Sequence, residues 1–561
     1  MLSQNTRNIL IIFRRTFITI GIIILALVAL VVWFFWDDAT SEKYDITIAD
    51  DKIPVFEQIA LDFDHEYNGE KSLPIAPAAL IDINNDNIDE VFFGGGMDQE
   101  DAIYAYRGNK FVDISSEVNL PRKGNTTTTV GVVSADFDNN GFTDIILGRE
   151  DGLRIYYNTN GKFIEKIIDT PMNEKSTPAG LTVGDIDKDG DLDIFMSTYI
   201  KKELMEGQTI FEDYTYGSTS ELLLNTGDEN YISITKPAGL DYIHNTFQGV
   251  FVDIDNDTWL DLIVVYDTGE ARTYKNNGDL TYTMKSNPLT KKFAYPMGLA
   301  VGDYNNDGLV DFMFSNTGST LPRALAKGDI KDASLFNEKW ILFRNDGDFK
   351  FTDTAAETKI ADYEFSWGCT FADMNNDGLQ DLMVAENYVD LAPNKLFRLK
   401  SRFLVQKEDG TFAPTEERSG VVNPHFAITS LVSDFNLDGY LDMIWVNIDT
   451  PSLAYINKGG TNNYIQIDLG ETVIAQGAKV TVTTPTKTLT DWLVTGEGLA
   501  SDQTALLQFG LGNDTSVSSI EVSLANDEKI SIDNPKINSI VDLKAAVNDR
   551  MNPIQEVSNQ E

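Results

Sequence analysis

Short apolar runs alternate with acidic turns along most of the chain. Each acidic turn ends in a carboxylate that leads directly into an apolar run, as at residues 192–196 and 382–384. Apolar runs this short, bounded by turn residues, predict β-strands. A third run in most units ends in a Gly turn, as at residues 222–227, and a fourth begins with an aromatic residue, as at Phe351. Four strands in each unit and repetition of the unit predict an all-β chain built as a β-propeller.

The acidic turns share a nine-residue pattern that is clearest from Asp185 to Asp193. Side-chain oxygens stand at positions 1, 3, 5 and 9, and Gly190 stands at position 6. Ca²⁺ takes roughly six to eight oxygen ligands, which alternate acidic residues on a tight loop can supply. We expect the backbone carbonyl at position 7 to contribute as well, and Gly at position 6 tolerates the positive φ of such a turn.

Seven loops follow this pattern at intervals of about 50–70 residues, which indicates a repeat protein. We number them one to seven along the chain and predict that they bind Ca²⁺, up to seven ions in all. The predicted ligands, at positions 1, 3, 5, 7 and 9, are Asp82, Asn84, Asp86, Ile88 and Glu90; Asp136, Asp138, Asn140, Phe142 and Asp144; Asp185, Asp187, Asp189, Asp191 and Asp193; Asp253, Asp255, Asp257, Trp259 and Asp261; Asp303, Asn305, Asp307, Leu309 and Asp311; Asp373, Asn375, Asp377, Leu379 and Asp381; and Asp434, Asn436, Asp438, Tyr440 and Asp442.

An EF-hand begins with the same spacing of oxygen ligands. It differs by ending in a bidentate Glu at position 12 and by lying between two helices. Position 12 is apolar in every loop of this chain: Phe93, Leu147, Met196, Val264, Phe314, Val384 and Trp445. The EF-hand interpretation is therefore rejected.

Seven units predict a seven-bladed propeller over residues 56–460. After loop seven the chain supplies two more strands before its character changes, so the last blade lacks a fourth strand. Residues 56–60, before loop one, fit that strand and would close the ring, leaving only short sheet edges. An open stack of calcium loops is the alternative, but units of this length are too long for the nonapeptide type.

These motifs resemble the FG-GAP/VCBS repeat of integrin alpha-chain propellers and many bacterial surface proteins. Loop four departs from the pattern with Thr258 at position 6, where a β-branched residue resists positive φ. Loop one has Asn87 at that position and the longer Glu90 at position 9. We therefore expect loops one and four to bind Ca²⁺ more weakly. The similarity covers about residues 56–459 and is carried by residues 131–138, 298–305 and 367–375.

Residues 461–545 change to Thr- and Val-rich alternation, which predicts a second, small all-β domain. Residues 463–469, 477–478, 496–503 and 509–512 resemble the ASPIC/UnbV domain. That domain follows the same propeller in the cartilage acidic protein family and its bacterial relatives, so the resemblance implies the same two-domain order. The last residues, 546–561, are polar and predict a disordered tail.

The N-terminal part of the chain predicts a membrane anchor. Residues 1–15 carry three arginines and no acid, and residues 16–36 are an uncharged, mostly apolar run. About 20 apolar residues span a bilayer as a helix, and positive charge before them places the N-terminus in the cytoplasm. The run is longer than the core of a cleaved signal peptide and very hydrophobic for a twin-arginine signal. We expect a signal anchor, a polar linker at residues 37–55, and a periplasmic or extracellular bulk.

The net charge of the chain limits the kind of partner that it can bind. The chain of 561 residues carries 87 acidic and 44 basic residues, for a net charge of −43. Binding of nucleic acid needs a basic surface, so this balance argues against such a partner. The single cysteine, Cys369, excludes an intrachain disulfide and is interpreted as a small buried hydrophobic residue.

The propeller face opposite the loops is the candidate ligand face, because the long insertions fall there. The links between blades would bring four further residues to the mouth of the central channel, where they bind a ligand or only fill the channel. The insertions lie at about residues 200–220, 316–338 and 386–402, and the four residues are His244, Tyr295, Trp367 and His425.

Two functions remain open. The first is a non-enzymatic, calcium-stabilised propeller that binds a protein or glycan, or serves as a scaffold subunit of a membrane complex. The second is a calcium-dependent carbohydrate-active enzyme, a polysaccharide lyase or hydrolase, with His244, Tyr295 and His425 as candidate bases. The chain has no H-E-x-x-H, G-x-S-x-G or P-loop motif, so we predict no catalytic residues.

Overall fold

The structure is a computed structural model. Residues 14–30 are helical and exposed, whereas residues 31–36 of the predicted anchor lie outside the described part of the chain. Among the residues described, no helix has both the length and the apolar character needed to cross a membrane. The structure describes residues 14–30, 43–67, 72–124, 127–205, 210–213, 215–227, 230–318, 323–388 and 399–558.

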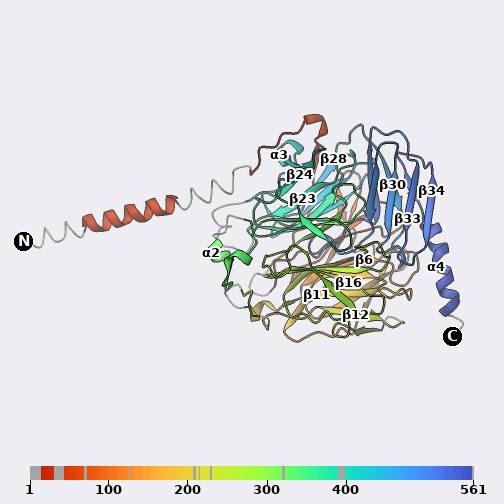
Figure 1. Cartoon of the computed structure of the whole chain (residues 1–561), viewed down its shortest axis with the longest axis horizontal. Coiled ribbons are helices and arrows are strands. Elements are labelled where there is room, and N and C mark those ends of the chain that lie inside the picture. Colours follow the sequence, from red (N-terminus) through yellow and green to blue (C-terminus); the bar gives the residue numbers. More distant parts are fainter. Residues whose placement is uncertain are drawn as a thin grey trace, which may run out of the picture.

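Seven four-stranded antiparallel sheets account for most of the described chain (Figure 1). The first two strands of each sheet are almost fully buried, which fits their continuous apolar runs. Six sheets use consecutive strands: β2 (Ala78–Ile81), β3 (Glu90–Phe93), β4 (Ala102–Tyr106) and β5 (Phe111–Asp113); β6 (Thr129–Ala135), β7 (Asp144–Arg149), β8 (Gly152–Asn158) and β9 (Phe163–Ile167); β10 (Ser176–Gly184), β11 (Asp193–Ile200), β12 (Glu221–Asn225) and β13 (Tyr231–Ser233); β14 (Thr246–Val252), β15 (Asp261–Tyr266), β16 (Ala271–Asn276) and β17 (Tyr282–Lys285); β18 (Leu299–Gly302), β19 (Asp311–Phe314), β20 (Ile341–Asn345) and β21 (Phe351–Asp353); and β22 (Ser366–Ala372), β23 (Asp381–Glu386), β24 (Arg402–Gln406) and β25 (Phe412–Pro414).

The seventh sheet closes the ring with a strand from the start of the chain. It contains β26 (Phe426–Ser433), β27 (Asp442–Ile448) and β28 (Leu453–Asn457), and β28 pairs with β1 (Phe56–Ala60). The sequence predicted this pairing, because loop seven is followed by too few strands to complete a sheet. Closure by β1 protects the edge of β28, which would otherwise present unpaired backbone groups.

The first strands of the sheets form the inner ring of a β-propeller. β2 contacts β6 and β26, β10 contacts β6 and β14, and β22 contacts β18 and β26. β14 and β18 share a hydrophobic cluster through Val250, Val252, Leu299 and Val301. The remaining short helices are η1 (Asp50–Lys52), η2 (Lys202–Leu204), α2 (Arg323–Ala326), η3 (Ala333–Leu335) and α3 (Glu416–Ser419).

The described part of the predicted linker lies against the propeller. Lys43 forms an ion pair with Glu364, and the Tyr44 hydroxyl donates to Asp362 at 2.7 Å. Further along, Arg418 donates to the carbonyl of Ile48 at 3.1 Å. Residues 43–55 are therefore a docked segment, a contact that their polar composition did not predict.

The C-terminal part forms two further sheets and a helix. The sheets contain β29 (Asn463–Asp468), β32 (Leu506–Gly512) and β35 (Ile540–Asp542), and β30 (Lys479–Thr483), β31 (Thr488–Trp492), β33 (Ser519–Ser523) and β34 (Lys529–Asp533). Helix α4 (Lys544–Ser558) stands where the sequence predicted a disordered tail from residue 546. Its start is held because Val547 is fully buried and Lys544 pairs with Asp468 at 2.8 Å.

A loop of the C-terminal domain enters the centre of the propeller ring. We call residues 495–503 the axial loop. Gly496 and Gly498 have φ of +83° and +90°, and a Cβ on Gly496 would lie 2.2 Å from the carbonyl oxygen of Leu181. Glycine is therefore required for this close approach. The loop contacts the first strand of six sheets, through Ala79, Ser134, Thr182, Gln248, Leu299 and Val432.

Candidate metal-binding site

All seven acidic loops fold around the side chain at position 1. In loop three, Asp185 accepts hydrogen bonds from the backbone N–H groups of Asp189 and Gly190, both at 3.1 Å. The equivalent pair of bonds is present in each of the other loops. The residue at position 6 has positive φ throughout, including Asn87 at 66° and Thr258 at 74°. The loops thus adopt one geometry despite the two departures at this position.

The carboxylate at position 9 is the buried end of each loop. In loop two, Asp144 accepts from the backbone N–H of Phe137 at 2.9 Å and from that of Asn158 at 2.6 Å. Asp144 begins β7 and Asn158 ends β8, so the second and third strands fix this carboxylate together. Asp144, Asp193, Asp261 and Asp311 have no exposed surface.

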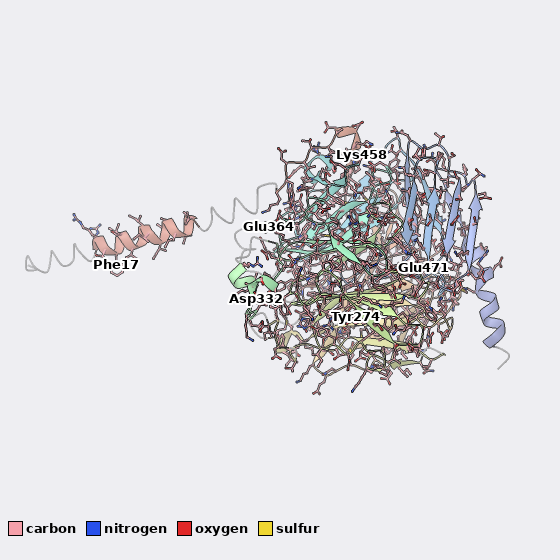
Figure 2. The ribbon with its side chains drawn as sticks, viewed as in Figure 1. Phe17, Tyr274, Asp332, Glu364, Lys458 and Glu471 are labelled. Carbon is pink, nitrogen blue, oxygen red and sulfur yellow. The ribbon has the colours of Figure 1, made fainter. Side chains whose placement is uncertain are left out.

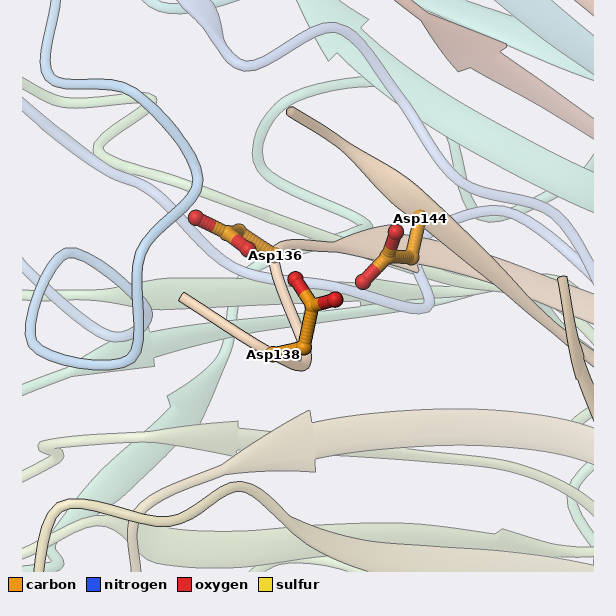
Figure 3. Close-up of side chains that lie close together, drawn as sticks. All are labelled: Asp136, Asp138 and Asp144. Atoms are coloured by element: carbon orange, nitrogen blue, oxygen red, sulfur yellow. The ribbon is translucent and has the colours of Figure 1, made fainter. Parts of the chain in front are cut away.

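The structure brings acidic oxygens close enough to share an ion in several loops. One oxygen from each of three residues lies within 4.8 Å of the others in loops two, three and four. Figure 3 shows Asp138 and Asp144 of loop two directed toward each other, with Asp136 close beside them. The three clusters are Asp136, Asp138 and Asp144; Asp185, Asp187 and Asp193; and Asp253, Asp255 and Asp261.

Three carboxylate oxygens in the loops are buried and without a hydrogen-bond partner: Asp187 Oδ1, Asp255 Oδ1 and Asp311 Oδ2. An orphaned buried oxygen is costly unless it is paired. Hard cations prefer such carboxylate and carbonyl oxygens, so the donor set fits a divalent ion. The residues that could hold it are those at positions 1, 3, 5 and 9, with the carbonyl at position 7.

Proton affinity in the loops is strongly perturbed. Burial raises the pKa of Asp144 to about 8, against the hydrogen bond from Asn158, and the nearby charge of Asp138 adds to the rise. Burial likewise raises the pKa of Asp261 to about 8 and that of Asp136 to about 6. A bound cation reverses this effect because it favours the ionised carboxylates.

Family models match both parts of the chain. A model of the FG-GAP-like repeat matches residues 82–147, 136–196, 253–314 and 333–384. A model of the ASPIC and UnbV domain matches residues 470–549. The chain thus contains FG-GAP-like repeats, followed by a region that matches the ASPIC and UnbV domain. The FG-GAP matches contain the whole of loops one to six, and the resemblance noted in the sequence is confirmed.

The chain is also similar to proteins described as cartilage acidic protein 1. It is 25% identical to cartilage acidic protein 1 of Mus musculus over 506 residues, which cover 83% of this chain and 73% of the relative. It is 26% identical to cartilage acidic protein 1 of Xenopus tropicalis over 316 residues, which cover 52% of this chain and 43% of that relative.

Solved structures resemble the chain at low sequence identity. A structure described as YCF48 bound to D1 peptide is 10% identical, with a TM-score of 0.39, and the match covers 73% of this chain and 99% of that one. The exotype rhamnogalacturonan lyase YesX is 12% identical, with a TM-score of 0.38, and the match covers 72% of this chain and 75% of that one.

Position 4 of the FG-GAP loops is a feature that the sequence interpretation missed. Its residue has positive φ in all seven loops, from 52° to 63°. Its side chain also reaches the next loop: Asn85 donates to the Gly141 carbonyl at 2.8 Å, and Asn376 donates to the Gly439 carbonyl at 2.7 Å. Asparagine tolerates this conformation, and its presence at position 4 of five loops was the available signal.

Asparagines at the end of the third strand also join neighbouring sheets. The Asn158 side chain donates to the Ile83 carbonyl at 2.9 Å, and that of Asn276 donates to the Ile186 carbonyl at 2.9 Å. Asn457 makes the same bond to Met374 at 2.8 Å. Since each acceptor is position 2 of the preceding loop, these side chains set the spacing between adjacent loops. The recurring Asn before the Gly turn was the signal.

The four candidate ligand-face residues do not share one open site. His244 and Trp367 are 2% and 5% exposed, so both are unavailable to a ligand in this conformation. Trp367 packs against Phe247 and donates from Nε1 to Asn387 at 3.1 Å. The Tyr295 hydroxyl donates to the Ala326 carbonyl at 2.6 Å, and His425 is half-buried. The channel-filling interpretation therefore fits these side chains better than the ligand-binding one.

Proposed function

We propose that this FG-GAP protein is a calcium-stabilised binding or scaffold module, held outside the cytoplasm by its N-terminal anchor. The observation that carries the proposal is the difference between the two faces of the propeller. The C-terminal domain covers the loop face, the side on which the acidic loops lie, through contacts such as Gln466 Nε2 to Asp434 at 3.0 Å. The opposite side, which we call the insertion face, is left for a partner.

The insertions on that face support a preformed surface. Phe211, from the insertion after β11, is fully buried against Phe293, Tyr295 and Phe336, with ring centroids 5.1–6.0 Å apart. Its backbone N–H donates to Asp329 at 2.7 Å. Insertions from two sheets thus lock together around a small apolar core, and a rigid surface loses less entropy when it binds.

The charge of the insertion face favours a partner with basic groups. A cavity of about 550 Å³ lies where the segments before β2, between β3 and β4, and after β5 meet. Five acidic residues line it, together with Arg122 as its single basic residue. Acidic clefts attract and orient cationic groups, so a protein with exposed Lys or Arg fits better than a neutral glycan. The acidic residues are Asp62, Asp64, Glu100, Asp101 and Asp113.

The docked linker supports a partner near the membrane. Glu364 precedes β22 on the insertion face, so the ion pair with Lys43 brings the chain onto the propeller at that face (Figure 2). Six residues separate Lys43 from the end of the predicted anchor, and even an extended chain of that length reaches only about 25 Å. The insertion face would therefore lie close to the bilayer, as a scaffold for a membrane complex requires.

The proposal is tested by capture of partners on the full-length protein in detergent with Ca²⁺. We expect a membrane-associated protein with a basic surface to be retained and to be lost from D62K/D64K. The control D279K changes an exposed acid of the β16–β17 turn and should retain it. Equal capture by all three proteins, or turnover of a polysaccharide without a protein partner, would contradict the proposal.

A further inference from the structure

Loop four contains a cation supplied by the chain itself. The Lys275 ammonium, on β16, forms a hydrogen-bonded ion pair with Asp255 and another with Asp257 at 2.5 Å. These two acids are positions 3 and 5 of the loop, where a metal ion would take its ligands. The Lys275 side chain is only 24% exposed, so the contact is partly shielded from solvent.

The position of Lys275 is defined by the register of the sheet. It precedes Asn276, whose N–H donates to Asp261 at 2.9 Å, and it pairs with Thr283. The equivalent residue in the preceding sheet is Leu224, which precedes Asn225 and pairs with Ile232.

No other sheet places a cation on its own loop in this way, within the described residues. The equivalent residues of the other sheets are Ala105, Tyr157, Arg344, Val405 and Ile456. Arg344 is the one other cation among them, and it pairs with Asp346 of the adjacent turn at 2.8 Å.

Loops three and four are otherwise closely matched. Both carry Asp at positions 1, 3, 5 and 9, and both bring three of these oxygens within 4.8 Å. They differ in the Lys275 ammonium, in position 6, where Thr258 replaces glycine, and in the residue types at positions 4 and 7. Thr258 also accepts a hydrogen bond from Lys188 of loop three at 2.9 Å. Two lysines thus contact loop four, and Lys275 holds the two positions at which loop three is free to bind an ion.

We propose that the Lys275 ammonium takes the place of the metal ion in loop four, so that this loop is held closed without calcium. The inference rests on the proposed calcium binding of the other loops. A metal and an ammonium cannot share the same Asp255 and Asp257 oxygens, because both positive charges require them. One sheet of the propeller would then keep its loop ordered when calcium is withdrawn.

The test compares K275M with the wild-type protein, both as full-length chains. Methionine keeps much of the side-chain length and removes the charge. We expect K275M to bind about one Ca²⁺ more per chain than the wild type, because the loop regains a full set of acidic ligands. K285M is the matched control: Lys285 lies near the same Phe349 ring as Lys275, at 5.8 and 5.7 Å, but pairs with Thr273 in the sheet. It should leave the ion count unchanged.

Terbium luminescence identifies the loop that gains the ion. Trp259 stands at position 7 of loop four, so an ion there receives energy from its indole ring. Because Trp259 also lies against Lys188 of loop three, with the Lys188 ammonium 4.6 Å from its ring centroid, the emission is compared between proteins. We expect it to be stronger in K275M than in wild type and K285M, and the increase to be lost in K275M/W259F. The reverse variant, L224K, should cost about one ion, since it places an ammonium at the matched position of loop three.

Three results bear on the two proposals separately. No additional ion in K275M, or no gain in Trp259-sensitised emission over the wild type, would overturn the assignment of Lys275. A wild type that binds several Ca²⁺ ions while either of these is observed would leave the proposed calcium binding intact. A wild type that binds no Ca²⁺ at all would instead refute the proposed function.

Discussion

The two faces of the propeller are built by different means. On the loop face one nine-residue loop is repeated seven times, and the same backbone hydrogen bonds recur in each copy. On the insertion face the connections differ from sheet to sheet, and Phe211 is buried by contacts that occur in no other sheet described. Figure 2 shows Glu364 on the side of the N-terminal helix and Glu471 on the opposite side, next to the C-terminal sheets. Repetition thus serves stability on one face and leaves the other free to vary.

The C-terminal domain adds to the difference between the two faces, because it binds the acidic loops. Lys479 donates to the Gly308 carbonyl at 2.7 Å, and Lys487 donates to the Asp377 carbonyl at 2.6 Å. Both acceptors belong to the loops themselves, so the shape of the loops and the docking of the domain depend on each other.

Removal of calcium should give the largest effect. Each site that binds only the folded state contributes about 2.7 kcal/mol at a ligand concentration of 100 Kd. With several sites emptied by a chelator, we expect Tm to fall by about 10 °C or more. Differential scanning calorimetry with Ca²⁺ or with chelator measures this. Equal Tm values would refute calcium binding. If chelator increased the hydrogen exchange of both faces equally, calcium would not stabilise the loop face in particular.

The pH should change the calcium effect in a defined direction. Without metal, the raised pKa values of Asp144, about 8, of Asp185, about 7, and of Asp136, about 6, exceed those of the unfolded chain. The folded state therefore binds protons more tightly, and its metal-free stability is greatest below about pH 4 and falls as pH rises toward 8.

Calcium needs the ionised carboxylates, so it compensates for this loss most at high pH. We expect the stabilisation by calcium to grow from pH 5 to pH 8 by on the order of several kcal/mol in unfolding free energy. The difference in Tm between calcium and chelator should widen accordingly. Thermal melts over this pH series measure it. A difference that stays constant, or that narrows as pH rises, would contradict the assignment of these carboxylates as ligands.

The axial loop provides a test of the coupling between the domain and the ring. Asp502 is 2% exposed and accepts hydrogen bonds from the backbone N–H groups of Ser134 at 2.7 Å and Gly496 at 2.9 Å. D502A leaves these buried donors without an acceptor, which should cost about 2–4 kcal/mol. E528A, an exposed acid of the same domain, is the control and should change stability by less than about 0.5 kcal/mol. Urea unfolding compares the two; equal stabilities would show that the domain only rests on the ring.

The sequence predicts the loop face far better than the contacts that cross between domains. The register of each loop and the closing strand at Phe56–Ala60 follow from local patterns of acids, Gly and short apolar runs, which act over a few residues. The place of residues 495–503 has no such local signal, because their Gly and Ser are selected by backbone approach to strands hundreds of residues away. The docking of Lys43 on Glu364 is equally non-local. Contacts between irregular segments that lie far apart in the chain produce no repeating pattern in the sequence, so the sequence does not predict them.

The smallest effect expected concerns the links between neighbouring loops. The Asn376 side chain donates to the Gly439 carbonyl at 2.7 Å and accepts from Gln508 of the C-terminal domain at 2.7 Å. Asn306 makes the corresponding bond to the Gly378 carbonyl at 2.9 Å, and in the part of the chain that the structure describes it has no side-chain hydrogen bond to that domain. N376A should therefore cost about 1–2 kcal/mol and N306A about 1 kcal/mol, since the first loses both a loop link and a domain link.

A double-mutant cycle separates the two links. Combining N376A with Q508A should give a cost below the sum of the single variants, because both remove the same hydrogen bond. Combining N306A with Q508A should give additive costs, because Asn306 and Gln508 share no bond. Additivity in both pairs would mean that Gln508 contributes nothing through Asn376, and the domain would then hold the loop face through its lysines and the axial loop alone.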